Sequence, residues 1–501
     1  MRRIITKTVF ALFGLTFVSS LLFSCKKDDD ESDDGNSSSI DISKTEIDPA
    51  TRADSGGSGV MLQGFTWSSP HAAGDWYSTI SSNADDIKDT FEYVWFPPAS
   101  DCTDTTGNGY LPRELNLLTQ KYPEKINYYG SEEDLRTAIS DIKPAKAIAD
   151  IVINHRCGTT SWGDFSNPDW GVVKGANYKA ICSNDEGFSE KSSDMYGARY
   201  KGNSDTGESY SAGRDLDHTN TDVQNGIVTW MNDVLKDAGF AGWRYDYVKG
   251  YAGKYVGYYN KKTSADFSVG EYYPTGSFSS SVPATWSNLI CNWIKETAGS
   301  TNSVEGQASR AFDFVLKGII NDVFGCGNSN SVAAGDGSRN YSLLASEFSV
   351  FRRLPGYAVT FVDNHDTGST QKQWYINPVG IAPAYAFILT HPGYPCVAWY
   401  HYFAAADCPT DSQNQYIGGE TVPGATLTYK EYLQTLINLR KTLGITDMSS
   451  VNVIQADSTR YAAEVTGENG AAYVVIGNGL DSTLAGYTPV IEGDDFQIFK
   501  R

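Results

Sequence analysis

Short, almost wholly apolar runs recur between residues 60 and 399, separated by more polar stretches. Continuous runs of this length are typical of strands buried on both faces, as in a parallel sheet. Helix-like stretches lie between them, and Ser131 is a suitable N-cap for one of these. Eight strands alternating with helices predict an α/β fold, a (β/α)8 barrel. The expected strands are residues 60–65, 93–98, 147–153, 239–244, 267–270, 312–315, 358–362 and 394–399, and the clearest helices are 132–139, 223–238 and 429–443.

Two stretches interrupt this alternation and predict additional domains. Residues 156–217 follow the third strand, are rich in Gly, Ser, Asn and Asp, and are too long for an ordinary loop, so we expect a small inserted domain. Residues 446–501 carry short alternating runs, which predict a C-terminal antiparallel β domain. The barrel is then formed by residues 59–155 and 218–445.

The amino-terminal segment has the pattern of a secretion signal. A positively charged start precedes an apolar run at residues 9–23 that is too short to span a bilayer comfortably. The ending Leu22-Phe23-Ser24-Cys25 resembles a bacterial lipobox, in which the Cys becomes the lipidated first residue of the mature protein. We therefore interpret residues 1–24 as a lipoprotein signal peptide and Cys25 as the lipidation site. Ordinary cleavage nearby, with Cys25 incidental, is the alternative.

The segment after Cys25 is predicted to be a flexible tether over residues 25–58. Its charged start, residues 26–31, resembles the acidic tag that directs some Gram-negative lipoproteins to the outer face of the outer membrane. A charged linker that faces the periplasm is the alternative. The remainder is rich in Ser, Asp and Gly and offers too little apolar surface to fold. We expect an outer-membrane lipoprotein exposed at the cell surface and held to the membrane through its lipid alone.

The net charge limits the classes of ligand, and the number of cysteines bears on disulfide bonds. The chain has 501 residues and a formal net charge of -20, which argues against nucleic acid or anionic lipid as a ligand and suits a neutral substrate. It contains 8 cysteines, and lipidation of Cys25 would leave an odd number, so no disulfide framework is predicted.

Acidic residues follow three of the predicted strands. Asp246 and Glu271 come directly after short apolar runs, and Asp366 lies just beyond another. Because catalytic groups of a parallel barrel lie at the carboxyl ends of its strands, we expect these acids to meet at one site. An Asp and a Glu placed together are the minimum equipment for cleaving a glycosidic bond.

Four short motifs in order resemble the α-amylase family of retaining glycoside hydrolases (family 13). They are residues 150–155, 242–246, 269–271 and 361–366. Further stretches, at residues 63–67, 149–157, 362–370 and 389–395, resemble the plant-type subgroup of that family. The resemblance extends over residues 59–501.

The resemblance implies roles for the three acids. Asp246 is expected to be the nucleophile that forms a covalent glycosyl-enzyme, with Arg244 on the same strand face keeping it ionised. Glu271 is expected to be the general acid and then the general base, with a pKa raised by burial and neighbouring carboxylates. Asp366 is expected to stabilise the distorted sugar in the reactive subsite.

Sugar contacts are implied for further residues of the same motifs. His155 and His365 are expected to hydrogen-bond the reactive sugar, and Tyr110 to stack on it. Trp67 is expected to line the cleft, although it and Tyr110 could equally be core rings. Tyr272 and Tyr273, which follow the acid, and Lys249 are expected on the leaving side. Lys249 is followed by Gly250 where other subgroups have Lys-His, so contacts on that side are less well defined by the resemblance.

A calcium ion is also implied, because the insert resembles the plant-type calcium loop. Asn154, Asp205 and Asp215 would bind Ca²⁺ through side chains, and Glu208 and Gly250 through backbone carbonyls. The ion would hold the insert against the barrel. The alternative is that these acids are ordinary surface residues of an acidic protein.

 The leading interpretation is an endo-acting α-amylase. It would cut internal α-1,4 links of starch, glycogen or maltodextrin, as a monomer. A maltogenic exo-enzyme or transglycosylase of the same family is one alternative, and only the subsites separate these. A surface glycan-binding lipoprotein with weak catalysis is the other, although the intact Asp246, Glu271 and Asp366 argue against it. Membership of an outer-membrane glycan-uptake assembly is compatible with the leading interpretation.

Overall fold

The computed structural model describes residues 47, 51–54, 56–71, 75–103, 107–119, 129–158, 163–170, 178–186, 201–327, 337–368, 371, 373–408, 415–480 and 484–501. The predicted signal peptide, Cys25 and most of the predicted tether lie outside the described residues. Within the described ranges, no helix has both the length and the apolar character needed to cross a membrane.

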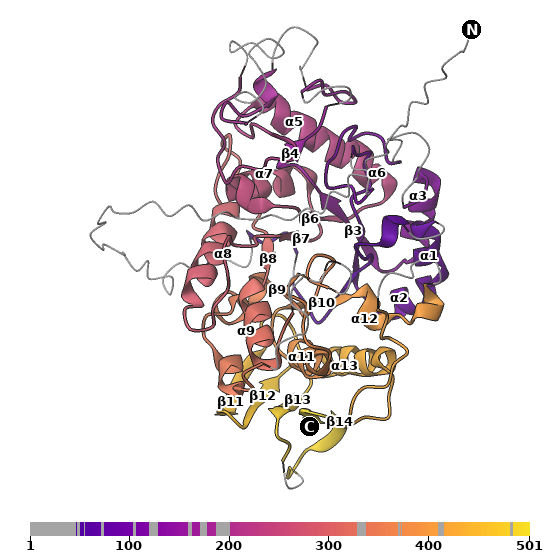
Figure 1. The fold of residues 1–501 in the computed structure, drawn as a ribbon, viewed down its shortest axis with the longest axis vertical. Helices are drawn as coiled ribbons and strands as arrows, with labels where there is room; N and C mark the ends of the chain where they lie inside the picture. The colour runs from indigo at the N-terminus through magenta and orange to yellow at the C-terminus, as the bar shows by residue number, and fades with distance from the viewer. Residues whose placement is uncertain are drawn as a thin grey trace, which may run out of the picture. The chain divides into compact units, whose positions relative to one another are not determined.

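Eight parallel strands close into a barrel, as the apolar runs predicted (Figure 1). Closure follows because β1 pairs with β2 on one side and with β10 on the other. The order around the barrel is β1-β10-β9-β8-β7-β6-β3-β2. Nearly every strand residue is buried, which explains why the runs are continuously apolar instead of alternating. The strands are β1 (Met61–Gln63), β2 (Tyr93–Trp95), β3 (Lys146–Ile151), β6 (Gly242–Tyr245), β7 (Ser268–Gly270), β8 (Arg310–Phe312), β9 (Ala358–Phe361) and β10 (Tyr394–Ala398).

The helices begin and end where side chains supply the caps. In α3, Ser131 and Asp134 form a reciprocal capping box, and in α13, Thr428 and Glu431 do the same. Gly444 ends α13 with φ +64°, a conformation that suits glycine. The α-helices are α1 (Trp76–Ser82), α2 (Ala84–Thr90), α3 (Glu132–Asp141), α5 (Thr221–Trp230), α6 (Lys236–Ala238), α7 (Gly253–Thr263), α8 (Ala284–Thr297), α9 (Phe314–Phe324), α10 (Val350–Arg353), α11 (Pro378–Thr390), α12 (Trp399–Tyr402) and α13 (Tyr429–Leu443).

Two predicted elements differ from the structure. The strand expected at residues 312–315 ends at Phe312, because the Asp313 side chain accepts a hydrogen bond from Leu316 N at 2.9 Å and caps α9. The helix expected at residues 223–238 consists of α5, a π-helical turn at Met231–Leu235 and α6. In the first case a polar N-cap outweighs the apolar pattern around it.

The segment after β3 leaves the barrel, as expected for an insert. Its described part contains a two-stranded antiparallel ladder of β4 (His155–Arg156) and β5 (Arg214–Asp215). The buried Arg156 side chain donates to the backbone carbonyls of Arg113, Ser166 and Pro168. This side chain therefore holds irregular backbone together where regular ladders are short.

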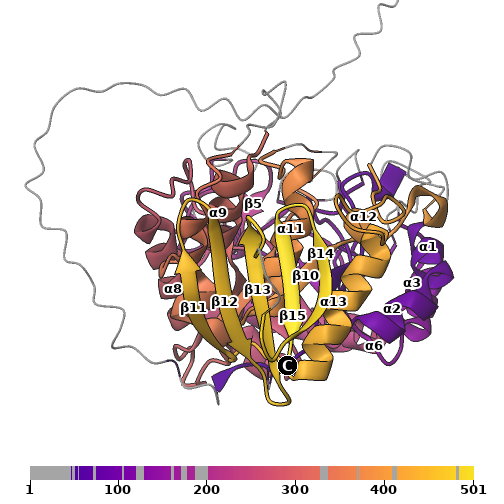
Figure 2. The same cartoon turned by 90° about the horizontal axis from the view of Figure 1, so that it is seen from below.

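The C-terminal segment forms a five-stranded antiparallel sheet, seen in yellow in Figure 2. Its order is β11-β12-β13-β15-β14, and β13 and β15 pack against α11. A buried hydrogen bond of 2.9 Å between Tyr461 OH and His391 Nε2 links the sheet to the end of α11. The strands are β11 (Ser450–Ala456), β12 (Arg460–Thr466), β13 (Ala471–Gly477), β14 (Thr488–Gly493) and β15 (Phe496–Lys500).

No disulfide bond joins the described cysteines, and most of them are buried. They are Cys102, Cys157, Cys182, Cys291, Cys326, Cys396 and Cys408. In this part of the chain, burial in the core rather than cross-linking accounts for their positions.

The tether boundary predicted at residue 58 is wrong, because residues before it pack on the barrel. Arg52 is buried, and its Nη1 lies 2.9 Å from Asp447 Oδ2. Asp54 accepts from Arg310 of β8, which also lies 2.8 Å from Asp447. Thr51 O accepts from the backbone of Ala308 at 2.7 Å. The polar composition of this segment predicted that it would not fold, but Arg52 and Asp54 form ion pairs with Asp447 and Arg310 of the folded part.

Replacing Asp447 tests this ion cluster. In Asp447→Ala, Arg52 and Arg310 lose a shared buried partner, so we expect the free energy of unfolding to fall by about 3–5 kcal/mol, measured by urea denaturation. Asp85→Ala, which removes only an exposed pair with Lys88, is the matched control and should leave stability unchanged. Equal midpoints for the two variants would contradict a structural role for the cluster.

Candidate active site

One guanidinium gathers three carboxylates at the carboxyl ends of the barrel strands. Arg244 of β6 is completely buried. Its Nη1 lies 2.8 Å from Asp150 Oδ1 and 2.8 Å from Asp246 Oδ1. Its Nη2 lies 2.8 Å from Glu271 Oε2, without the alignment of a hydrogen bond. Since buried anions require a compensating charge, Arg244 is the group around which these acids assemble.

Strand register brings the three acids to this guanidinium. Asp150 of β3 pairs in register with Arg244 of the neighbouring β6. Asp246 follows β6, and its N–H donates to Ile151 O at 3.0 Å. Glu271 follows β7, and its N–H donates to Tyr245 O at 2.9 Å. Acids from three adjacent parallel strands, Asp150, Asp246 and Glu271, thus lie at one level of the barrel.

A chain of hydrogen bonds extends from Asp150 to the β9 end. Gln63 Nε2 donates to His365 Nδ1 at 2.8 Å, which leaves Nε2 of the neutral ring as the protonated nitrogen. That Nε2 lies 2.8 Å from the Tyr110 hydroxyl, which donates to Asp150 Oδ2 at 2.9 Å. Burial lowers the pKa of His365 to about 4, consistent with a neutral imidazole. Tyr110 and His365 are therefore held in fixed orientations beside the acids.

Asp366 lies next to this group but is more open to solvent. Its Oδ2 is 3.5 Å from His365 Nε2, and its side chain is 33% exposed. Its negative charge contributes to raising the pKa of both Asp246 and Glu271. The structure thus brings Asp366 within electrostatic reach of the two acids, in a position that a ligand can reach.

Aromatic and imidazole rings border the acids. Trp67 lies parallel to Tyr110, with ring centroids 6.2 Å apart, and parallel to His365 at the same distance. His155 Nε2 bonds to the Tyr110 carbonyl at 2.8 Å, and its ring stacks on Tyr210 of the insert at 4.0 Å. Trp67, Tyr110 and His155 were all predicted at this site, and the structure places them together.

Lys249 and Tyr272 lie farther toward the insert and α8. Lys249 Nζ donates to Thr275 Oγ1 at 2.7 Å and pairs with Glu208 Oε2 at 3.2 Å. The Tyr272 ring lies 6.4 Å from Trp293, between centroids. Lys249 is therefore already paired with the insert, a contact that the sequence pattern did not reveal.

Burial sets the protonation of the two central acids. It raises the pKa of Asp246 to about 7 and that of Glu271 to about 8, against the opposing effect of Arg244. Glu271 thus keeps its proton to the higher pH, as a general acid requires. The expectation that Arg244 would keep Asp246 ionised is met only in direction, because desolvation of the carboxylate is the larger effect.

Three residues of this network were not singled out from the sequence. Asp150 interrupts the apolar run of β3, which was a visible signal of a buried partner. Trp95 Nε1 donates to Asp150 Oδ2 at 3.0 Å, and the Arg244 guanidinium lies 4.8 Å from the Trp95 ring centroid. Neither Trp95 nor Gln63 carries a local pattern that distinguishes it from an ordinary strand residue.

The residues expected to bind calcium also lie together, and their chemistry fits a hard cation. Asn154 Oδ1 and Asp205 Oδ2 are buried and lack hydrogen-bond partners. Burial and then the Asp205 charge raise the pKa of Asp215 to about 8, so the two carboxylates repel each other. A Cβ on Gly250 would come within 1.9 Å of Asn154 Oδ1, so this backbone approaches the same oxygen. Buried oxygens that lack hydrogen-bond partners are ligands of the kind that Ca²⁺ prefers.

Glu208 contributes differently from the other expected ligands. Its side chain is exposed and pairs with Lys249, while its N–H donates to Lys249 O at 2.9 Å. This leaves its backbone carbonyl as the group available for the role that the resemblance implies. A neighbouring acidic group of Asp185, Glu186 and Asp215 has metal-like spacing, but Arg214 pairs with the first two.

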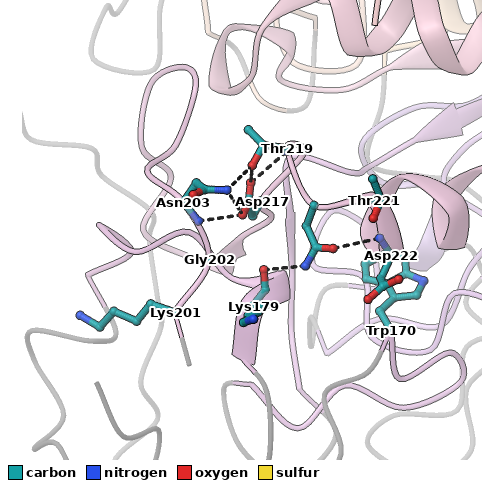
Figure 3. Close-up of a pocket in the computed structure, with 10 residues that line it drawn as sticks. Trp170, Lys179, Lys201, Gly202, Asn203, Asp217, Thr219, Thr221 and Asp222 are labelled. Atoms are coloured by element: carbon teal, nitrogen blue, oxygen red, sulfur yellow. Dashed lines mark hydrogen bonds between the residues drawn. The ribbon is translucent and has the colours of Figure 1, made fainter. Parts of the chain in front are cut away.

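A separate hollow of about 480 Å³ lies beside the amino end of α5 (Figure 3). Its polar groups bond to one another: Asp217 accepts from the backbone N–H of Asn203 and from Thr219 Oγ1. Asn220 accepts from the backbone N–H of Asp222 and so caps the helix. Asp246, Glu271 and Asp366 do not line it. We therefore assign the chemistry to the barrel mouth instead of to this hollow.

Comparisons with known proteins agree with this geometry. No protein-family model matches the chain. Among curated relatives, probable α-amylase 2 of Arabidopsis thaliana is 31% identical over 414 residues, which span 81% of this chain and 86% of that protein. The chain belongs to the α-amylase family. It is a glycoside hydrolase of the amylase type.

Other relatives of this α-amylase family member are more distant. The chloroplastic α-amylase 3 of Arabidopsis thaliana is 27% identical, over 88% of this chain and 44% of that protein. A glucan 1,4-α-maltotetraohydrolase of Roseateles saccharophilus is 27% identical, over 85% of this chain and 69% of that protein. The crystal structure of an Anoxybacillus α-amylase aligns with 88% of this chain and 97% of its own chain, with a TM-score of 0.57 and 15% identity. This similarity supports the fold.

Proposed function

We propose that this protein is an endo-acting, retaining α-amylase that hydrolyses internal α-1,4 bonds of starch, glycogen or maltodextrin. The observation that carries the proposal is the single buried Arg244 in contact with both Asp246 and Glu271. The shared cation brings the proposed nucleophile and the proposed acid close together, and the two carboxyl groups of retaining glycosidases lie about 5–5.5 Å apart. A structural relative with this fold was crystallised with acarbose, which supports the substrate class.

In the first half-reaction, Asp246 attacks the anomeric carbon while Glu271 donates its proton to the glycosidic oxygen. Arg244 stabilises the ionised Asp246, and the low dielectric around Glu271 holds the proton on the acid until the leaving oxygen accepts it. In the second, Glu271 accepts a proton from water, which attacks the glycosyl–Asp246 ester and releases the sugar with retained configuration.

The neighbouring groups bind and orient the reactive sugar. Asp366, His155 and His365 contact its hydroxyls, and the Nε2–H of the neutral His365 donates to the Tyr110 hydroxyl, which fixes both side chains. Tyr110 and Trp67 supply aromatic faces, with Tyr110 held in place by its bonds to Asp150 and His365. Lys249 and Tyr272 contact the leaving side. Orientation by groups that are already hydrogen-bonded reduces the entropy lost on reaching the transition state.

Calcium would be held by Asn154, Asp205 and Asp215 through side chains and by Glu208 and Gly250 through backbone carbonyls. When bound, it supplies positive charge that neutralises buried carboxylates and ties the insert to the segment after β6. The protein's own contribution is the unsatisfied Asn154 Oδ1 and Asp205 Oδ2, which would otherwise remain desolvated without partners.

We also propose that the protein is a monomeric lipoprotein, lipidated at Cys25 and displayed on the outer membrane. The signal-like start and the acidic segment after Cys25 support this. A surface α-amylase could feed an outer-membrane glycan-uptake assembly. The family's maltotetraohydrolases keep an exo-acting alternative open, which a time course of product lengths distinguishes from endo action.

Removing the proposed acid tests the mechanism. In Glu271→Gln, we expect starch binding and melting temperature to persist while reducing-end release falls by at least about 100-fold, since general acid–base catalysis contributes about 10²–10⁴. The exposed Glu420→Gln is the matched control and should keep full activity. Starch hydrolysis by Glu271→Gln at the parent rate would exclude Glu271 as the acid.

The pH profile tests the raised pKa of Glu271. Because burial raises that pKa to about 8, the proton needed for catalysis is present below this pH and is lost above it. We expect kcat/KM to fall as pH rises through about 8 and also to fall as pH drops through about 7, where Asp246 becomes protonated. The two pKa values read from the profile belong to the interacting pair of acids. An alkaline limb near the ordinary glutamate value of 4.5 would show that Glu271 is solvated.

Chelation tests the calcium proposal. Removal of calcium should lower the melting temperature, because binding at a thousandfold excess over Kd stabilises a fold by about 4 kcal/mol. Asp205→Asn should weaken calcium binding measured by calorimetry. Asp233→Asn, at an exposed position, is the matched control and should leave calcium binding unchanged. If calcium changes neither the melting temperature nor the calorimetric signal, the calcium proposal is wrong.

A further inference from the structure

Tyr247, the residue directly after Asp246, has a backbone conformation that costs energy. Its φ is +44° and its ψ is +47°, in the left-handed region, where a residue with a Cβ is disfavoured by about 1–2 kcal/mol. The chain turns here from β6 into a 3₁₀ turn at Val248–Gly250, and glycine would make this turn without that cost. Because such a conformation persists only where the surroundings fix it, the contacts of the tyrosine must hold the backbone in place.

This conformation directs the backbone after Asp246 at Glu271. The strands β6 and β7, which precede these two acids, pair with each other in the barrel (Figure 1). The Tyr247 N–H donates to Glu271 Oε2 at 3.3 Å, and the Val248 N–H donates to Glu271 O at 3.3 Å. The turn therefore holds both the carboxyl group and the backbone of Glu271.

The two oxygens of the Glu271 carboxyl group have different surroundings. Oε2 accepts from the Tyr247 N–H and lies 2.8 Å from Arg244 Nη2, so it faces two groups that favour a negative charge. A carboxylic acid carries its proton on one oxygen, and the oxygen that faces these two groups is the one that stays unprotonated. The proton of Glu271 therefore lies on Oε1.

Contacts with the insert hold the Tyr247 side chain. Its hydroxyl donates to Ser209 O at 3.2 Å. Its ring packs edge-on against Tyr210, with ring centroids 5.1 Å apart, and the Tyr210 ring stacks on His155 at 4.0 Å. The Lys249 ammonium lies 5.2 Å from the Tyr247 ring centroid. These contacts fix the ring, and with it the backbone that carries the N–H.

We propose that Tyr247 is a positioning residue for the general acid. Contacts of its side chain with the insert keep its backbone left-handed, this backbone directs its N–H at Glu271 Oε2, and the proton of the acid is thereby held on Oε1. This inference rests on the proposed function, in which Glu271 is the acid, and it adds the residue that orients the carboxyl group. Tyr247 acts through Glu271 and needs no contact with the substrate.

The arrangement assists the proton transfer itself. As the glycosidic bond breaks, the leaving oxygen takes the proton from Oε1, and Glu271 becomes a carboxylate. The Tyr247 N–H and Arg244 stabilise this new charge more than they stabilise the neutral acid, so they lower the energy of the transition state. Burial raises the pKa of Glu271 to about 8, while Arg244 and the Tyr247 N–H act in the opposite direction.

Two aryl α-maltotriosides that differ in the basicity of the leaving phenol test this role. Phenolate needs a proton to leave, whereas p-nitrophenolate is a far weaker base and leaves with little help. In Tyr247→Ala, the ratio of kcat/KM for p-nitrophenyl α-maltotrioside to that for phenyl α-maltotrioside should rise about tenfold, which is a part of the about 10²–10⁴-fold that a positioned acid contributes. Loss of a sugar contact alone would lower both rates and leave this ratio unchanged.

Two further substitutions separate the backbone from the ring. Tyr247→Gly also lacks the ring but adopts the left-handed conformation without strain, so its ratio should rise less than that of Tyr247→Ala, and it should melt at a higher temperature. Tyr247→Phe keeps the ring, loses the bond to Ser209 O, and should stay close to the parent ratio. Tyr473→Ala, at a partly buried ring in the C-terminal sheet, is the matched control and should keep the parent ratio.

The positioning role and the proposed function fail differently. A parent ratio in both Tyr247→Ala and Tyr247→Gly, or an equal rise in both, would overturn the positioning role and leave the proposed function intact. If Tyr247→Ala does not fold, a Tyr247→Gly ratio no higher than that of Tyr247→Phe would overturn the role in the same way. Glu271→Gln, which lacks the acid, should show the largest ratio of all, and a parent ratio in that variant would overturn Glu271 as the acid and the positioning role with it.

Discussion

The buried ion cluster around Arg244 is the interaction on which the site depends. Each carboxylate that it contacts would be strongly destabilised alone in the barrel, and so would the guanidinium without them. The cluster joins β3, β6 and β7 at their carboxyl ends. Apolar packing holds the strands together in the barrel interior. At the carboxyl ends of the strands, the buried carboxylates require the positive charge of Arg244, and Arg244 requires them. The same burial that makes the cluster costly raises the pKa of Glu271, which is the property an acid catalyst needs.

The surrounding elements keep this cluster in one arrangement. Trp95 and Tyr110 bond the outer oxygen of Asp150, and Gln63 fixes His365. The insert reaches the same region through the stacking of Tyr210 on His155. Stability of the insert and geometry of the site are thereby linked, which is why a cation at the insert would matter to catalysis without taking part in it.

Sequence reasoning succeeded where a single physical pattern dominates. Continuous apolar runs identified the buried strands, and the acids after two of those runs, Asp246 and Glu271, both contact Arg244. It failed where two local signals compete: Asp313 caps α9 inside a run that reads as strand, and Asp54 pairs with Arg310 inside a segment that reads as unfolded. Asn321 of α9 donates to the Trp374 carbonyl from a position distant in sequence, and no local pattern predicts a positive φ at a tryptophan.

The most direct test of the central claim is to trap the sugar on Asp246. Glu271→Gln lacks the base for the second step but can still react with α-maltotriosyl fluoride, whose leaving group needs no proton. Peptide mass spectrometry of that variant after brief reaction should find a maltotriosyl ester on Asp246. Fluoride release with the adduct on another residue, or with no adduct at any time point, would contradict the account.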